Sequence, residues 1–286
     1  MVSVCDPEES QDDFVLARRR HALAAAAAAR LRPDHVVSGR SAAILHGLPT
    51  LAVPPRPELT ARNPSGNGRR NSSHVFSASI VDAEVATWFG VPLATVERTI
   101  VDLARHNRRD GIMAADAALW QELIDVQQIE ESLARSRGWP GVRQARAVLA
   151  LASSLAESPL ESITRLAMYD DDFPEPQLQY YIGGRRIDLA LPDHRLLIEA
   201  DGRVKYRTPT DASSDDALWQ EKLREQAVRR PGWWMERVIW GDVTTSWPMT
   251  SDRLWRALQR LGPLPPRTPW RLLWPLDEPG RWPLQA

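Results

Sequence analysis

The sequence has a single cysteine and no long apolar run, and each absence excludes a class of protein. With Cys5 as its only cysteine, the chain can form neither an internal disulfide nor a zinc ribbon. The longest apolar run, Ala22 to Ala29, is flanked by arginines. It is much shorter than the ~20 residues of a membrane span, and the acidic residues before it argue against a signal peptide. We therefore expect a soluble, cytoplasmic protein that does not contact a membrane.

A strong net charge is also lacking. The 286 residues include 36 Lys and Arg against 37 Asp and Glu, a net charge of −1, which excludes a uniformly basic nucleic-acid coat protein. The charge is uneven, however. Residues 202–286 carry 14 basic and 10 acidic residues (net +4), whereas residues 1–201 carry 22 and 27 (net −5). This asymmetry favours a nucleic-acid groove in the second half, although a solvated helix face would give a similar count.

Tryptophan is abundant and clustered. Nine of the 12 tryptophans lie in the last 68 residues, which indicates a separately built C-terminal half. The length suits about two domains. We place the domains at residues 1–150 and 151–262, followed by a Pro- and Trp-rich tail at residues 263–286 that either wraps over the second domain or binds a partner.

Hydrophobic periodicity and turn residues predict elements in both halves. In the first half we expect helices over residues 14–31, 38 or 41 to 46, 92–105, 111–121 and 142–156, one short strand between loops at 49–57 and 61–73, and two strands between 74 and 89. In the second half we expect a helix from residue 158, strands at 177–182, 185–191 and 195–201, a helix at 218–230, a strand at 233–240 and a helix at 251–261. This order predicts an α/β (α+β) protein, with a mixed sheet of about four strands flanked by helices in the second half and a mainly helical first half.

Acidic residues gather on the hairpin that the second and third strands of the second half form. If Asp193 and His194 make a two-residue loop, Asp188 lies opposite Glu199. A longer loop would shift the register by one residue and leave both acids at the same end of the hairpin. Because side chains alternate along a strand, Asp201 shares a face with Glu199.

The preceding helix can bring Glu161 to the same face. Such carboxylates can bind Mg²⁺, which uses one or two carboxylates together with water and phosphate oxygens. Lys205 and Lys222 are the only lysines of the chain and lie near this hairpin in sequence, where one of them can orient an attacking water. The alternative is that the acids are solvated turn residues.

Three blocks of the second half, ESPLES, RRIDLALPDHRLLIEADGRVKY and QEKLREQAVRRPGWWMERVIWGDV, resemble the very-short-patch-repair-like branch of the PD-(D/E)XK nucleases over roughly residues 155–262. The resemblance implies a restriction-endonuclease-like fold and phosphodiester hydrolysis that depends on Mg²⁺ or Mn²⁺. The first-strand acid of the family falls on Asp188, the central acid on Glu199 and the leading-helix acid on Glu161.

The motif lysine of that family falls on Asp201, which is a departure from the pattern. Lys205 or Lys222 can substitute for it in space, or the domain has become a binding module. Arginines near the predicted site are candidates for contacts to DNA: Arg203, Arg207 and Arg224.

Two blocks of the first half, SGRSAAILHGLP and GVPLATVERTIVDLAR, resemble actinobacterial proteins related to the AbiEi-type antitoxins of type IV toxin–antitoxin systems. In those proteins a winged helix comes first. Here about 35 residues precede the first block, so the winged helix is missing or truncated. The alternative for the first block is a packed helix.

The leading hypothesis is therefore a metal-dependent DNA endonuclease in which Asp188 and Glu199 hold the ion, with Glu161 and Asp201 as supporting acids. The rival hypothesis is a non-catalytic antitoxin or DNA-binding transcriptional regulator that has a cognate toxin and uses the nuclease fold as a scaffold.

Overall fold

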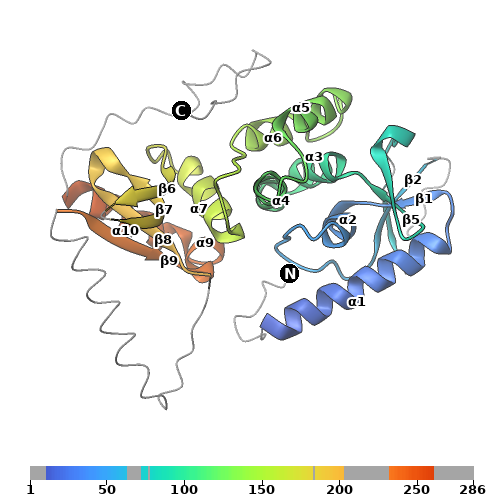
Figure 1. Cartoon of the computed structure of the whole chain (residues 1–286), viewed down its shortest axis with the longest axis horizontal. Helices are drawn as coiled ribbons and strands as arrows, with labels where there is room; N and C mark the ends of the chain where they lie inside the picture. The colour runs from blue at the N-terminus through green and yellow to red at the C-terminus, as the bar shows by residue number, and fades with distance from the viewer. Residues whose placement is uncertain (1–10, 63–71, 77, 183, 203–231, 261–286) are drawn as a thin grey trace. The chain divides into compact units, whose positions relative to one another are not determined.

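The computed structural model describes residues 11–62, 72–76, 78–182, 184–202 and 232–260. The chain divides into two compact units between Ser154 and Leu155, near the boundary expected at residue 150 (Figure 1). Both units combine helices and strands, so the protein belongs to the α+β class that the sequence predicts.

The first unit contains a five-stranded mixed sheet with the strand order β3-β2-β1-β5-β4. Its strands are β1 (His35–Val37), β2 (Glu58–Ala61), β3 (His74–Phe76), β4 (Val85–Trp88) and β5 (Val91–Ala94). The expected strand between two loops is β2. As predicted, helices contribute more residues to this unit than strands do. The short strands, for which no pairing was predicted, form one sheet.

Helices account for most of the rest of this unit. They are α1 (Gln11–Arg30), α2 (Gly39–Leu45), α3 (Val96–His106), α4 (Arg108–Trp120), α5 (Val126–Arg135) and α6 (Val142–Leu149), with a short 3-10 turn η1 (Asp82–Glu84). Buried alanines of α1, including Ala25 and Ala29, pack with Val36, Leu59 and Leu93 of the sheet. Small side chains let the helix approach the strands closely.

Three expectations for this unit were wrong in detail. Residues 92–94 were assigned to a helix but form part of β5, because Val91 and Leu93 alternate into the core at 2% exposure each. The last helix ends at Leu149 instead of residue 156. Helix α5 was not predicted, although Asp125 and Gln128 form a capping box at its start.

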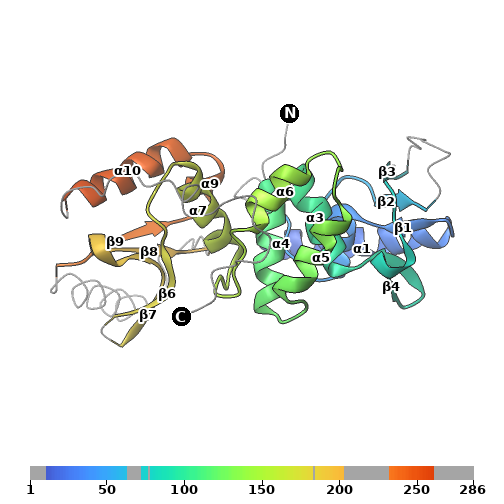
Figure 2. The same cartoon turned by 90° about the horizontal axis from the view of Figure 1, so that it is seen from above.

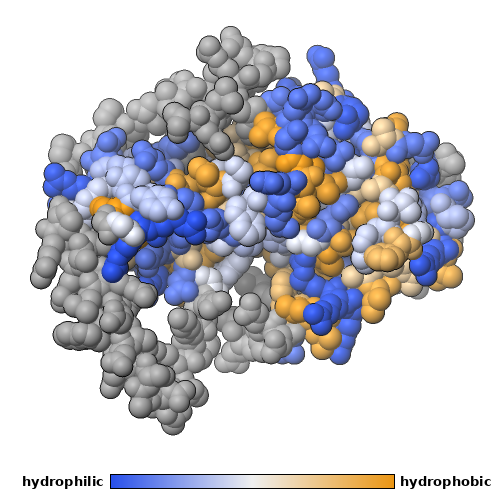
Figure 3. All heavy atoms as spheres, in the orientation of Figure 1, coloured by the Kyte–Doolittle hydropathy of each residue, from blue (hydrophilic) through white to orange (hydrophobic). Residues whose placement is uncertain are grey.

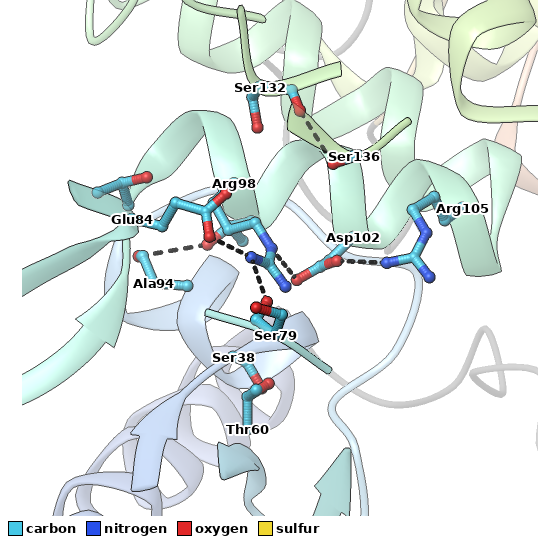
Figure 4. Close-up of polar contacts among 12 residues, drawn as sticks. Ser38, Thr60, Ser79, Glu84, Ala94, Arg98, Asp102, Arg105, Ser132 and Ser136 are labelled. Atoms are coloured by element: carbon cyan, nitrogen blue, oxygen red, sulfur yellow. Dashed lines mark hydrogen bonds and ion pairs between the residues drawn. The ribbon is translucent and has the colours of Figure 1, made fainter. Parts of the chain in front are cut away.

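The guanidinium group of Arg98, in the VERTIVDLAR block, is fully buried. Its Nη1 donates to Oε2 of Glu84 at 2.6 Å and to the carbonyl of Ser79 at 3.0 Å, and its Nε donates to Oδ2 of Asp102 at 2.8 Å (Figure 4). Arg105 pairs with the other oxygen of Asp102 at 2.9 Å. The block therefore joins α3 to the segment before β4 through buried charge.

An aromatic ring completes this cluster. The guanidinium carbons of Arg98 and Arg105 lie 4.4 and 4.9 Å from the ring centroid of Trp139, within the range of cation–π interactions. Arg105 also donates to the carbonyl of Pro140 at 2.7 Å. The loop between α5 and α6 is thus fixed to α3.

We expect Arg98→Met to lower the free energy of unfolding by about 3–5 kcal/mol, because it leaves carboxylates buried without their partner. The matched control is Arg62→Met. Arg62 pairs at 2.7 Å with Asp82, whose side chain is 93% exposed, so its loss should cost less than about 1 kcal/mol. Urea denaturation of the two variants measures the difference, and equal losses would contradict this account.

The SGRSAAILHGLP block, residues 38–49, contains the whole of α2 with its caps, and most of the helix is buried. Gly39 has φ +55°, and a Cβ there would collide with Oε2 of Glu58. That oxygen accepts the N–H of Arg40 at 2.6 Å. Arg40 Nε in turn donates at 2.7 Å to Asp110, which is fully buried. These contacts fix α2 to β2 and α4.

We expect Gly39→Ala to destabilise the first unit more than Gly47→Ala. Gly47 also has a positive φ, +76°, but among the described residues nothing lies within 4 Å of a Cβ there. Gly47→Ala should therefore cost about 1 kcal/mol of backbone strain, and Gly39→Ala should add the collision with Glu58. Denaturation midpoints compare the two, and equal losses would exclude the collision.

The second unit is built on a four-stranded mixed sheet with the order β6-β7-β8-β9. Its elements are α7 (Pro159–Asp170), β6 (Gln177–Ile182), β7 (Arg185–Leu191), the 3-10 turn η2 (Pro192–His194), β8 (Leu196–Ala200), β9 (Trp234–Val238), α9 (Trp240–Thr244) and α10 (Trp247–Arg260). Strands β6, β7 and β8 are antiparallel neighbours, whereas β9 runs parallel to β8. The mixed sheet of four strands agrees with the prediction.

Helices α7, α9 and α10 lie on one face of this sheet (Figure 2). Aromatic residues join α10 to the end of α7, since Phe173 stacks on Trp255 with ring centroids 4.3 Å apart and Trp247 Nε1 donates to Asp171 at 2.9 Å. These two tryptophans are therefore packing residues. The helix predicted at residues 218–230 and the tail at residues 263–286 lie outside the described residues.

The described surface of the second unit is mostly hydrophilic in the view of Figure 3. In the described part of the chain, no helix combines the length and the apolar character needed to cross a membrane.

Candidate acidic site of the second unit

The turn between β7 and β8 sets the register of the hairpin. Leu189 pairs with Ile198 and Leu191 with Leu196, and the N–H of Arg195 donates to the carbonyl of Pro192 at 3.0 Å. Four residues, Pro192 to Arg195, separate the last pair of the ladder, and the register is the one that the predicted two-residue loop would give. Continuing the register by one residue puts Asp188 opposite Glu199.

Strand β7 changes its geometry at Asp188. The ladder with β8 ends at Leu189, and beyond it the N–H of Ala200 donates to Oδ2 of Asp188 at 2.8 Å. Ile187 and Ala190 pack in one cluster although they are three residues apart. The regular alternation of side chains between the two faces of the sheet is therefore interrupted between these residues. Gln179, on the other side of Asp188, has φ +51°. Asp188 thus occupies an irregular position in the middle of the sheet.

Helix α7 positions Glu161. Ser158 caps the helix by accepting the N–H of Glu161 at 3.2 Å, and Pro159 follows in the first turn. Glu161 is 3% exposed. Its Oε2 accepts the N–H of Glu157 at 3.1 Å and Nε2 of Gln179 at 2.8 Å. Neutral donors therefore hold this buried carboxylate between α7 and β6.

Burial and neighbouring acids act together on Glu161 and Asp188. Burial raises the pKa of Glu161; hydrogen bonds with Ser158 and Glu157 oppose this, and the charges of Asp188 and Glu157 add to it. Burial also raises the pKa of Asp188; the Ala200 N–H and Arg186 oppose this, and Glu157 and Asp201 add to it. The carboxylates therefore lie near enough to disfavour one another's ionisation.

Glu199 makes a different contact from the one predicted. It lies opposite Arg237 of β9, and the two side chains form an ion pair at 3.4 Å. Alternation puts Glu199 on the same sheet face as Leu197, which packs with Ile187 and Ala190. Asp201 continues the parallel ladder by donating its N–H to Val238 at 2.9 Å.

The structure thus brings Glu161, Asp188 and Asp201 into electrostatic interaction, whereas Glu199 pairs with Arg237. Several residues named from the sequence lie outside the described residues: Lys205, Lys222, Arg203, Arg207 and Arg224.

Sequence reasoning missed three polar residues around the acids. Arg186 donates from both terminal nitrogens to the two carboxylate oxygens of Glu157, each at 2.7 Å. Gln179 holds Glu161. Continuing the register from Leu178 and Leu189 would have placed Gln179 beside Asp188, but the contact between Arg186 and Glu157 depends on how α7 packs.

The donor set suits a hard cation, since all its candidate ligands are carboxylate oxygens and Mg²⁺ needs only one or two of them. In the described ranges, no three His, Cys, Asp or Glu side chains form a group that could hold a metal ion. Any ion here would therefore use fewer carboxylates from those ranges, with water or substrate as the other ligands.

Comparison with known proteins gives relatives but no function. No protein-family model matches the chain, and no solved structure matches it. Uncharacterized proteins from two strains of Mycobacterium tuberculosis are each 35% identical to it over 168 residues, which is 57% of this chain and 60% of each relative. The chain thus spans less than two thirds of the length of these relatives.

We expect Asp188→Asn to stabilise the protein at pH 7. Because the pKa of Asp188 is raised in the folded state, the folded chain binds this proton more tightly than the unfolded chain. The free energy of unfolding therefore falls as the pH rises from the unfolded pKa, about 3.9, through the folded value. The asparagine removes this loss and can still accept the Ala200 N–H.

Thermal unfolding of both proteins between pH 4 and pH 7 measures the effect. The stabilisation by Asp188→Asn should shrink toward pH 4, and the control Asp193→Asn, at an exposed turn position, should show little difference. A variant less stable than the wild type at pH 7 but not at pH 4 would contradict the raised pKa.

Proposed function

We propose that the protein is a cytoplasmic, metal-dependent endonuclease that hydrolyses phosphodiester bonds in DNA. The observation that carries this proposal is the interaction of Glu161, Asp188 and Asp201 at the point where β7 leaves β8. Carboxylates that disfavour one another's ionisation cost stability, and such groups concentrate at functional sites. The mixed sheet with α7 before it also supports the proposal, because the resemblance to PD-(D/E)XK nucleases implies this arrangement.

In the proposed enzyme, Asp188 and Glu199 hold Mg²⁺ or Mn²⁺, with Glu161 and Asp201 as supporting acids. Bound there, the metal supplies an activated water and stabilises charge on the phosphoryl group. The contact between Glu199 and Arg237 is long and partly exposed, with side-chain exposures of 32% and 44%. Pairs of this kind add little stability, so Glu199 can give up Arg237 for a cation.

The chain's own residues orient the reaction. Gln179 and the N–H of Glu157 fix the carboxylate of Glu161, and burial raises its pKa. The N–H of Ala200 fixes one oxygen of Asp188 and leaves the other for a ligand. Lys205 or Lys222 is proposed to orient the attacking water.

A cleavage assay tests the proposal. Supercoiled plasmid is incubated with wild type, Asp188→Asn or Asp193→Asn in Mg²⁺, Mn²⁺ or EDTA. We expect metal-dependent cleavage by the wild type and by Asp193→Asn, and a loss of at least about 100-fold for Asp188→Asn, as when a catalytic group is removed. Equal cleavage by all three proteins, or none by the wild type, would exclude the enzyme. Labelled RNA in parallel defines the substrate.

The second candidate is a non-catalytic type IV antitoxin or DNA-binding regulator. The acid Asp201 favours it, because it stands where the nuclease motif has its lysine. The likeness of the first-unit blocks to AbiEi-type antitoxins also favours it. This candidate predicts tight binding of its own promoter in EDTA and a stable complex with a nucleotidyltransferase-like toxin. Absence of both would exclude it.

A further inference from the structure

An ion pair lies beside the acidic cluster. Arg186 is two residues before Asp188 on β7, and Glu157 immediately precedes the cap of α7. The guanidinium Nη1 and Nη2 of Arg186 donate to Oε1 and Oε2 of Glu157, respectively, at 2.7 Å each. The backbone N–H of Glu157 also donates to Glu161, and the charge of Arg186 acts on Asp188. The pair is therefore connected to both acids.

The geometry of this pair matches that of a phosphate. A guanidinium fork binds two oxygens of a carboxylate or of a phosphate in the same planar way. The two side chains are 46% and 31% exposed, so solvent reaches them. Another two-oxygen anion can therefore compete with Glu157 for the guanidinium of Arg186.

A DNA-cleaving site at this position needs such a cation. Glu157, Glu161, Asp188 and Asp201 are all acids, and a phosphodiester that approaches them is repelled. Within the part of the chain that the structure describes, Arg186 is the cation whose charge opposes the raised pKa of Asp188.

We propose that Arg186 is a phosphodiester-binding residue and that Glu157 holds it in place until a phosphate of DNA replaces the carboxylate. This inference rests on the proposed nuclease function and specifies how that site meets its substrate. In this inference Glu157 competes with the substrate for Arg186. Removing the charge of Arg186 and removing the charge of Glu157, each in a separate variant, must therefore have opposite effects on DNA binding.

Binding of a fluorescent DNA duplex to the full chain, measured by anisotropy in EDTA over a range of salt concentrations, tests the inference. We expect Arg186→Gln to weaken binding at least about 10-fold and to reduce the slope of log K against log salt by about 0.9, the value for one phosphate contact. Glu157→Gln should tighten binding. Arg186→Lys should keep most of the slope, because its charge remains, but bind more weakly than the wild type.

Arg256 and Asp252 provide the matched control, since they form an exposed ion pair at 2.6 Å on α10. Arg256→Gln and Asp252→Asn change the net charge by the same amounts but should alter binding less than about 2-fold. Thermal unfolding checks that every variant is folded.

Several results would overturn the inference. These are equal effects of Arg186→Gln and Arg256→Gln, weaker binding by both Arg186→Gln and Glu157→Gln, or no DNA binding by the wild type. Inorganic phosphate that stabilises the wild type but not Arg186→Gln, with DNA binding unchanged, would identify free phosphate as the ligand instead.

The cleavage assay keeps the two proposals separate. Metal-dependent cleavage with normal DNA binding by Arg186→Gln would overturn the subsite and leave the nuclease. Opposite effects of the two variants without any cleavage would support the subsite on a protein that binds DNA and does not cut it.

Discussion

One tight turn sets the register of the hairpin that carries Asp188 and Glu199. The chain reverses at Pro192–His194, and Arg195 adopts a φ of +51° to complete the turn. This reversal pairs Leu189 with Ile198, next to the two acids, and the parallel pairing of β8 with β9 aligns Glu199 with Arg237. A slip of one residue would turn the side chains of a strand to the other face. It would bury the acids in place of residues such as Leu197.

The two units treat buried charge in opposite ways. In the first, Arg98 meets the carboxylates of Glu84 and Asp102, so the charges compensate one another and hold helices and strands together. In the second, Glu161 is buried against an amide and an N–H; this burial raises its pKa, and the charges of neighbouring acids add to the effect. A stable fold has no need of the second arrangement, and this contrast distinguishes a candidate site from a structural cluster.

Local signals account for what could be predicted from the sequence. The bounds of β6 and β7 follow from alternation and from turn residues, and the register of β7 with β8 follows from these. Pro92–Ala94 were misassigned because burial of Val91 and Leu93 outweighed a helical pattern. The contact of Arg186 with Glu157 joins residues 29 positions apart. It depends on the packing of α7 against the sheet, for which sequence spacing gives no signal.

The residue at position 201 decides which groups must carry positive charge in the proposed enzyme. Replacing a lysine by an aspartate changes the local charge by two units, so a phosphodiester near Asp188 would face acids without the usual motif cation. Besides Lys205 and Lys222, which lie outside the described residues, two sources can restore the balance: a metal held by carboxylates, and a guanidinium that exchanges partners. A metal ion binds carboxylates in their ionised form. Because the pKa values of Glu161 and Asp188 are raised, these carboxylates ionise at a higher pH than usual. Metal binding should therefore compete with protons, and Arg186 is the partner whose charge does not depend on pH in this range.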